Sequence, residues 1–143
     1  MIGAGGLDNA RGKFVELMRR LAAQNNPIRV VEDHVASTTY APALAARTAD
    51  LVERGAHGIF HAGGGTPISW FDWASMIFEA AGLAPSLKPT NEREFRTAAR
   101  RPRYSALSNA KMEGIGIAPM PALKVAVRDY MRARSARLAA TKS

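Results

Sequence analysis

Arginines concentrate in one short stretch of this sequence, and they are the residues best suited to chemistry with a phosphorylated ligand. The stretch runs from Arg93 to Arg103 and holds five arginines around Pro102. A guanidinium group presents a fixed fork of N–H donors, which matches the geometry of a phosphate or diphosphate. The chain carries 20 Lys and Arg against 12 Asp and Glu, a formal net charge of +8. Such a surplus of positive charge favours binding to nucleic acid, to an anionic membrane surface or to a small phosphorylated ligand.

The histidines are further candidates. His34 and its neighbour Asp33 follow an expected strand, at the kind of end where ligand loops gather, so we expect a polar contact with a substrate or a partner subunit there. His57 and His61 are four residues apart, which on a strand would separate them by about 13 Å. The helical H-E-x-x-H pattern is absent. We therefore expect a structural role for His61 and no metal site.

The composition excludes several other kinds of site. The chain has no cysteine, which excludes disulfides, thiolate metal ligands and a cysteine nucleophile. It also shows no paired-carboxylate motif, no Ser/His/Asp signature and no P-loop. No apolar run approaches the roughly 18–20 residues of a membrane span, and the start lacks the pattern of a secretory signal. We expect a cytoplasmic protein that does not associate with a membrane.

The elements that must position these side chains are organised around residues 55–82. Gly58–His61 is short, apolar and bounded by glycines, which predicts a buried strand. Gly63–Pro67 then breaks regular structure, and Ser69 is placed to cap a helix that ends at Gly82. Apolar side chains recur along that helix at three- and four-residue spacing, at Trp70, Trp73 and Ile77. A strand followed by a glycine loop and a helix is an α/β unit.

Periodicity and turn signals predict further elements on both sides of this unit. Before it we expect a helix over about 12–24, a strand over 28–31, a loop over 35–41 and a helix over 42–53. After it we expect a strand within 85–90, a brief helix near 92–95, extended chain over 105–107, one or two helical turns over 109–113, and a helix over 122–137. Some side chains are expected to face the core: Phe14, Leu17 and Leu21 on the first helix, and Leu44, Ala45, Thr48 and Leu51 on the second. About three short strands and five or six helices suit part of a larger α/β enzyme.

Several motifs, taken in order, resemble those of one enzyme family. Residues 58–61, GIFH, and residues 69–74, SWFDWA, resemble G-(I/L)-(Y/F)-H and S-W-(Y/F)-(D/E)-(F/W)-A of the dTDP-4-dehydrorhamnose reductases. Residues 30–40, VVEDHVASTTY, resemble V-V-D-D-Q-x-G-S-P-T-Y, and residues 101–111 resemble R-P-x-Y-S-x-L-x-x-x-K. The resemblance covers roughly residues 12–135. It implies the C-terminal, substrate-binding part of an extended short-chain dehydrogenase/reductase, an α/β (Rossmann-like) fold with few short strands.

The resemblance also implies a reaction and a set of contacts. Complete members use NADPH or NADH to reduce dTDP-4-dehydro-L-rhamnose to dTDP-L-rhamnose for cell-surface polysaccharide. By this resemblance Arg101 is expected to reach the diphosphate of a dTDP-sugar, with Arg103, Lys13 and His34 as further substrate-binding residues. Lys13 stands where the family has Asn, and His34 where it has Gln. Lys13 would act as a flexible point charge.

Two parts of the family pattern are missing from this sequence. Members carry a G-x-x-G-x-x-G cofactor loop and a Tyr-x-x-x-Lys pair, but no glycine run here has that spacing. None of the three tyrosines is followed four positions later by lysine. We therefore expect that this chain alone binds no cofactor, contains no catalytic residue and is inactive. Its expected partners are the missing Rossmann half or a further copy of itself.

The sequence leaves three functions open. The first is the sugar-nucleotide-binding part of a reductase, with a flexible glycine-rich start over 1–11, the binding part over 12–138 and a disordered tail over 139–143. The second is a non-catalytic regulatory or partner-binding module of the same superfamily. The third is nucleic-acid binding by the basic residues after Tyr130, which we interpret first as a frayed, solvated end because no nucleic-acid-binding motif accompanies them.

Overall fold

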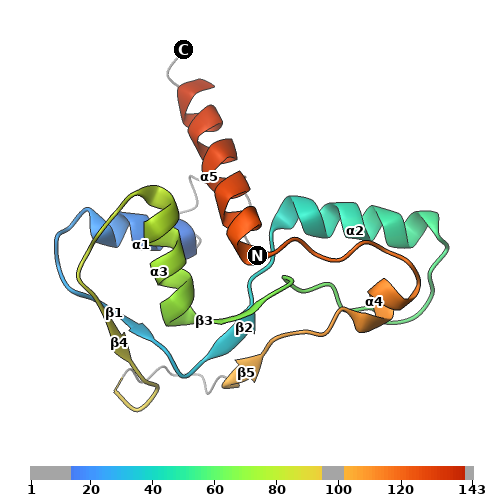
Figure 1. The fold of residues 1–143 in the computed structure, drawn as a ribbon, viewed down its shortest axis with the longest axis horizontal. Helices are drawn as coiled ribbons and strands as arrows, with labels where there is room; N and C mark the ends of the chain where they lie inside the picture. Colours follow the sequence, from blue (N-terminus) through green and yellow to red (C-terminus); the bar gives the residue numbers. More distant parts are fainter. Residues whose placement is uncertain (1–13, 95–101, 141–143) are drawn as a thin grey trace.

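The computed structural model describes residues 14–94 and 102–140, and these form five helices and five short strands (Figure 1). The helices are α1 (Phe14–Ala22), α2 (Ala41–Glu53), α3 (Trp70–Ala81), α4 (Ala110–Gly114) and α5 (Leu123–Ala140). The strands are β1 (Ile28–Val31), β2 (Val35–Ser37), β3 (Pro67–Ser69), β4 (Leu87–Thr90) and β5 (Tyr104–Ser105). Among the described residues, none of the helices combines the length and the hydrophobicity that a membrane span requires.

The strands form two small sheets. β1 and β4 pair in parallel, with Ile28 opposite Leu87 and Val31 opposite Thr90. In the other sheet β2 lies between β3 and β5, antiparallel to β3 and parallel to β5. Because only three residues separate β1 from β2, the two sheets follow one another directly along the chain (Figure 1).

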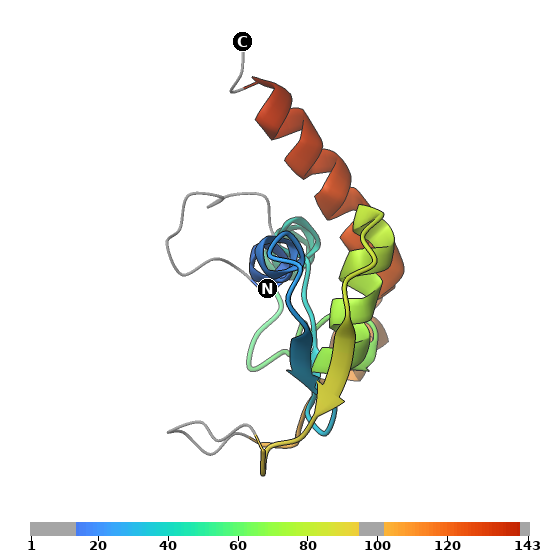
Figure 2. The same cartoon turned by 90° about the vertical axis from the view of Figure 1, so that its left-hand side faces the viewer.

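The main core joins α1, α3 and α5 to β1. Its buried side chains come from all four elements: Val15, Met18, Ile28, Val30, Trp73, Ala74, Ile77, Phe78, Leu123, Val127 and Tyr130. Phe14 stacks on Trp73 with ring centroids 4.5 Å apart and meets Trp70 edge-on at 4.8 Å. Figures 1 and 2 both show α3 beside the β1–β4 pair. This packing holds β1 in a fixed position relative to α1 and α3.

A second, smaller cluster lies under α2 and α4, at the other end of the molecule from β1 and β4 (Figure 1). Met112, Ile117 and Met120 are buried there, and Leu44, Leu51 and Phe60 pack against them. α2 has no fully buried residue, and Ala45 and Thr48, which were expected to face inward, are exposed. The many small residues of α2 give no clear apolar stripe, which explains this error.

The central helix begins and ends as the sequence predicts. The Ser69 side chain accepts a hydrogen bond from the backbone N–H of Asp72 at 3.0 Å, so it caps α3. Gly82 ends the helix in the left-handed conformation, with φ of 64°. These local signals need no distant partner, and they are confirmed.

The strand predicted over 58–61 is wrong. These residues form no strand, Ile59 is 78% exposed, and Gly58 has φ of 93°, which interrupts an extended chain. A side chain from α4 holds this segment in place: the Lys111 ammonium donates to the Ile59 carbonyl oxygen at 2.7 Å and lies over the Phe60 ring. His61 is exposed, so it is not an interior structural histidine. The strand that precedes α3 is β3 instead.

Three other expectations need correction. Residues 35–37 of the predicted loop form β2, whose partners lie about thirty and seventy residues away in sequence. Residues 92–94 form a turn, although Asn91 accepts hydrogen bonds from the N–H groups of Arg93 and Glu94 as a cap would.

α5 continues to Ala140, so the basic residues after Tyr130 lie on a helix up to that point and not on a frayed end. The glycine-rich start, 1–11, and residues 141–143 lie outside the described residues.

Candidate functional site

The candidate site lies where the parallel strands β1 and β4 end. Their carboxyl ends meet at one edge, where the Glu32 N–H donates to the Thr90 carbonyl oxygen at 2.9 Å. The chain leaves β1 through residues 32–34 and leaves β4 through the turn at 91–94. In open α/β sheets, ligands bind outside the carboxyl ends of the strands. The two segments are therefore placed to receive a ligand.

Asp33 joins these two segments. Its carboxylate accepts the Glu92 backbone N–H at 3.2 and 3.3 Å, and the His34 Nδ1 lies 3.1 Å from Oδ1. Burial works to raise the pKa of Asp33, but the hydrogen bonds from Glu92 and His34 outweigh it and hold that pKa below its usual value. The ionised carboxylate thus fixes the start of the arginine-rich segment to the end of β1.

His34 and Arg103 are brought together by the backbone. The Val35 N–H donates to the Arg103 carbonyl oxygen at 2.8 Å, where β2 begins to pair with β5. The His34 side chain is only 10% exposed, whereas that of Arg103 is 64% exposed, with Nε 3.8 Å from the Glu92 carboxylate. One buried imidazole and one accessible guanidinium therefore lie at the same strand end. Arg101 and Lys13, the other two predicted substrate-binding residues, lie outside the described residues.

Arg29 is a further cation at this end that the sequence did not single out. Its guanidinium donates to the Thr90 hydroxyl oxygen at 3.2 Å and pairs with the Glu94 carboxylate. The pairing with Arg29 holds the pKa of Glu94 below its ordinary value. Arg29 thus ties the turn after β4 back to β1. The sequence signal that could have identified Arg29 is its position as a cation within the otherwise apolar strand IRVV.

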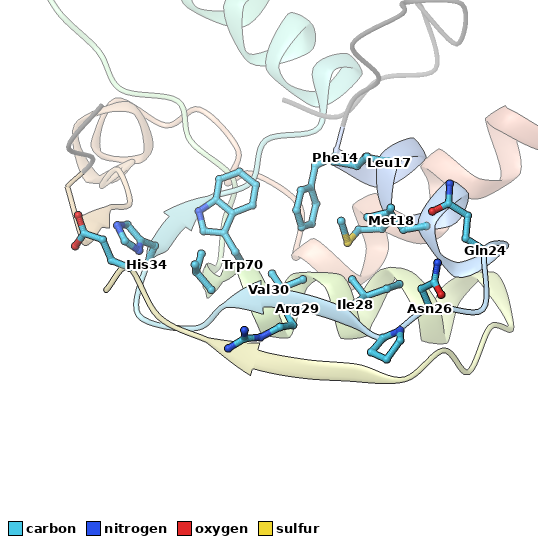
Figure 3. A pocket seen from close by; sticks show the side chains of 14 residues that line it. Phe14, Leu17, Met18, Gln24, Asn26, Ile28, Arg29, Val30, His34 and Trp70 are labelled. Carbon is cyan, nitrogen blue, oxygen red and sulfur yellow. The ribbon is translucent and has the colours of Figure 1, made fainter. Parts of the chain in front are cut away.

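A pocket of about 560 Å³ lies next to this strand end, between α1 and β1 (Figure 3). Most of its lining is apolar, with polar groups at its two ends: Phe14, Leu17, Met18, Leu21, Gln24, Asn26, Pro27, Ile28, Arg29, Val30, Val31, His34, Trp70 and Glu92. The sequence placed Leu17 in the core, but this side chain is 37% exposed and lines the pocket. A helical apolar stripe does not reveal whether another element covers it.

The glycine-rich loop at Gly63–Gly65 is closely packed. A Cβ atom on Gly64 would lie 1.8 Å from the Thr38 carbonyl oxygen. Gly63 is held on both sides by the Asn109 amide, at 2.9 and 3.0 Å. The loop therefore lies against protein and leaves no open cradle for a pyrophosphate. Within the described ranges, no group of three His, Cys, Asp or Glu side chains could hold a metal ion.

A family model described as the RmlD substrate binding domain matches residues 5–135 of this chain. The chain belongs to this family. The match confirms the resemblance drawn from the motifs. The predicted fold class, the α/β C-terminal part of an extended short-chain dehydrogenase/reductase, is confirmed as well.

Curated relatives carry related names. The chain is 34% identical over 122 residues to the spore coat polysaccharide biosynthesis protein SpsK of Bacillus subtilis (strain 168), covering 85% of this chain and 42% of that protein. It is 36% identical over 122 residues to a dTDP-4-dehydrorhamnose reductase of Mycolicibacterium smegmatis, covering 84% of this chain and 37% of that protein. The chain therefore spans less than half the length of these relatives.

A solved structure shows the same fold. The dTDP-4-dehydrorhamnose reductase of Bacillus anthracis str. Ames, crystallised in complex with NADP, has a TM-score of 0.80 and 29% sequence identity. The similar region covers 84% of this chain and 43% of that one. The fold described above is thus one part of a larger architecture in that enzyme.

Proposed function

We propose that this chain is the sugar-nucleotide-binding part of a dTDP-4-dehydrorhamnose reductase-like protein. The observation that carries the proposal is the family match over residues 5–135, since the matched domain is described as substrate-binding. The geometry supports it, because the arginine-rich segment begins at the joined carboxyl ends of β1 and β4. The ligand we propose is a dTDP-sugar, which carries a diphosphate suited to guanidinium groups.

The proposed contacts rest on the family resemblance and on charge. Arg101 binds the diphosphate through its guanidinium fork, and Arg103, which is accessible at the strand end, adds a second cation. Lys13 adds a point charge, and His34 offers a polar edge positioned by Asp33. The Asp33 carboxylate, which accepts the Glu92 backbone N–H, would fix the start of the arginine-rich segment relative to His34.

Binding and chemistry are separate in this proposal. The sequence contains neither a G-x-x-G-x-x-G loop nor a Tyr-x-x-x-Lys pair, and the described glycine loop at Gly63–Gly65 lies against other parts of the protein. This chain would therefore hold and orient the sugar nucleotide, while a reduced nicotinamide and a proton donor would have to come from elsewhere. Accordingly, we propose no catalytic residue in this chain.

Calorimetric titration with dTDP and dTDP-rhamnose tests the binding proposal. We expect a saturable heat, with an affinity that falls at least tenfold in Arg101→Ala, which corresponds to about 1.4 kcal/mol. Arg103→Ala should weaken binding less, because an accessible cation contributes less than a bidentate one. Arg132→Ala, an exposed residue on α5, is the matched control and should bind as the unchanged chain does. Equal affinities in Arg101→Ala and Arg132→Ala would contradict the proposal.

A turnover assay tests the division between binding and chemistry. The purified chain, given NADPH or NADH and dTDP-4-dehydro-L-rhamnose, should show no oxidation of the reduced cofactor above the rate without protein. Clear turnover would show that the machinery for hydride transfer is present after all. An absence of nucleotide binding, together with a stable complex with another protein, would favour a regulatory module instead.

A further inference from the structure

Two carboxylate side chains, those of Asp33 and Glu92, lie at the strand end where we propose that a diphosphate binds. Both side chains are partly exposed, so an approaching ligand would meet their charge. Because like charges repel, each carboxylate by itself opposes an anionic ligand. An acid at such a place needs a role other than its charge, and the contacts of these two side chains indicate that role.

Asp33 holds the backbone of the turn that follows β4. The Glu92 N–H lies 3.3 Å from Oδ1 of Asp33 and 3.2 Å from Oδ2, so both carboxylate oxygens face it. A hydrogen bond to a charged acceptor is about twice as strong as one between neutral groups. The other end of the turn is held separately, because Arg29 pairs with the Glu94 carboxylate. Asp33 therefore fixes the position of Glu92 at the near end of the turn.

The Glu92 carboxylate in turn faces the guanidinium group of Arg103, with Oε2 3.8 Å from Nε. Among the described residues, this is the one ion pair that Arg103 makes. The backbone of Arg103 is fixed by the Val35 N–H, but its long side chain is accessible and can take many rotamers. A side chain that is already oriented loses less entropy when it binds a ligand. Glu92 is therefore placed to orient the cation of Arg103.

We propose that Asp33 is a positioning residue of the sugar-nucleotide site: it fixes Glu92, and the Glu92 carboxylate orients the Arg103 guanidinium for the diphosphate. The inference rests on the proposed function and deepens it, because it gives two acids a part in binding an anion. Asp33 acts through Arg103 and needs no contact with the ligand. The sign of its effect is diagnostic. Removal of an acid that only repels the diphosphate would strengthen binding, whereas removal of a positioning acid weakens it.

Calorimetric titration of the full chain with dTDP, at low and at high salt, tests this role. At low salt Asp33→Ala should bind dTDP about fivefold more weakly, on the scale of one exposed ion pair. The difference should shrink at high salt, because salt screens the attraction of an exposed cation, whereas a general loss of structure would weaken binding at both. Asp33→Asn keeps an acceptor oxygen for the Glu92 N–H and should bind better than Asp33→Ala. Asp50→Ala, on α2, is the matched control and should bind as the unchanged chain does.

A double-mutant cycle shows whether Asp33 acts through Arg103. In a chain that already carries Arg103→Ala, the change Asp33→Ala should weaken dTDP binding by less than about twofold, since the group that it positions is gone. An equal loss with and without Arg103 would overturn the proposal, and so would equal or tighter binding by Asp33→Ala than by the unchanged chain.

Asp33→Asn decides the matter if Asp33→Ala fails to fold. It should still bind dTDP more weakly than the unchanged chain, although it removes a negative charge, and equal or tighter binding would overturn the proposal. The two proposals fail in different ways. Absence of dTDP binding by the unchanged chain rejects the proposed function and this inference with it. Equal binding by the unchanged chain and the Asp33 variants rejects only the positioning role.

Discussion

Gly64 lies so close to the backbone of Thr38 that a Cβ atom at this position would be 1.8 Å from the Thr38 carbonyl oxygen. Its N–H donates to the Thr39 hydroxyl at 3.0 Å, and that hydroxyl donates to the Ser37 carbonyl oxygen at 3.3 Å. These contacts hold the glycine loop against the segment that follows β2. The glycines predicted an interruption of regular secondary structure, but the sequence did not show that they pack against the backbone of Thr38.

Replacing Gly64 with alanine should therefore destabilise the protein strongly. The added methyl group requires the backbone of Thr38 to move, and we expect the free energy of unfolding to fall by about 3 kcal/mol, at the upper end for overpacking. Gly114→Ala is the matched control, because nothing lies within 4 Å of the added atom and the position is helical. Urea denaturation followed by circular dichroism measures both. Similar midpoints for the two variants would show that the close approach is absent.

At the scale of elements, α1 and α5 are joined by a charged cluster. The Glu16 carboxylate accepts hydrogen bonds from the Tyr130 hydroxyl at 2.7 Å and from Arg134 Nε and Nη2 at 2.7 and 3.0 Å. The Glu16 and Arg134 side chains are 17% and 19% exposed. Burial acts to raise the pKa of Glu16, but the hydrogen bonds from Arg134 and Tyr130 outweigh it, so the pKa of Glu16 lies below its ordinary 4.5.

The free energy of unfolding should therefore depend on pH through this cluster. Since the pKa of Glu16 is lower in the folded state, its stabilisation is complete above the ordinary value of 4.5 and is lost as the pH falls through the folded value. Glu16→Gln should lower the free energy of unfolding at pH 7 by about 2 kcal/mol and flatten its fall in acid. Glu79→Gln, whose exposed partner Lys124 is 3.7 Å away, should change little. Thermal unfolding between pH 3 and 7 measures both, and parallel curves for Glu16→Gln and the unchanged chain would contradict this account.

Helices were more predictable than strands, and the reason is physical. The cap at Ser69 and the stop at Gly82 act within one turn of the helix, so their signals are local. The strand at 35–37 depends on partners near residues 68 and 104, which the local sequence does not contain. The strand expected at 58–61 failed for the same reason, because an apolar segment without a neighbouring strand does not form a sheet.

At the scale of the whole molecule, the candidate site was predicted in part. His34 was placed at a strand end, and the structure brings it beside Arg103 through the Val35 N–H. Arg101 and Lys13 stay predictions, because they lie outside the described residues. The pocket between α1 and β1 was not predicted, because the sequence does not show which side chains of α1 stay uncovered by other elements. The chain spans less than half the length of the two relatives named above.

The claim that this chain binds a sugar nucleotide at the ends of β1 and β4 is tested most directly by mapping amide chemical shifts during titration with dTDP-rhamnose. We expect saturable changes at Glu32–His34, at Asn91–Glu94 and at Arg103, with α2 and α4 unchanged. Saturable changes confined to α2 and α4, or no change at millimolar ligand, would contradict the account.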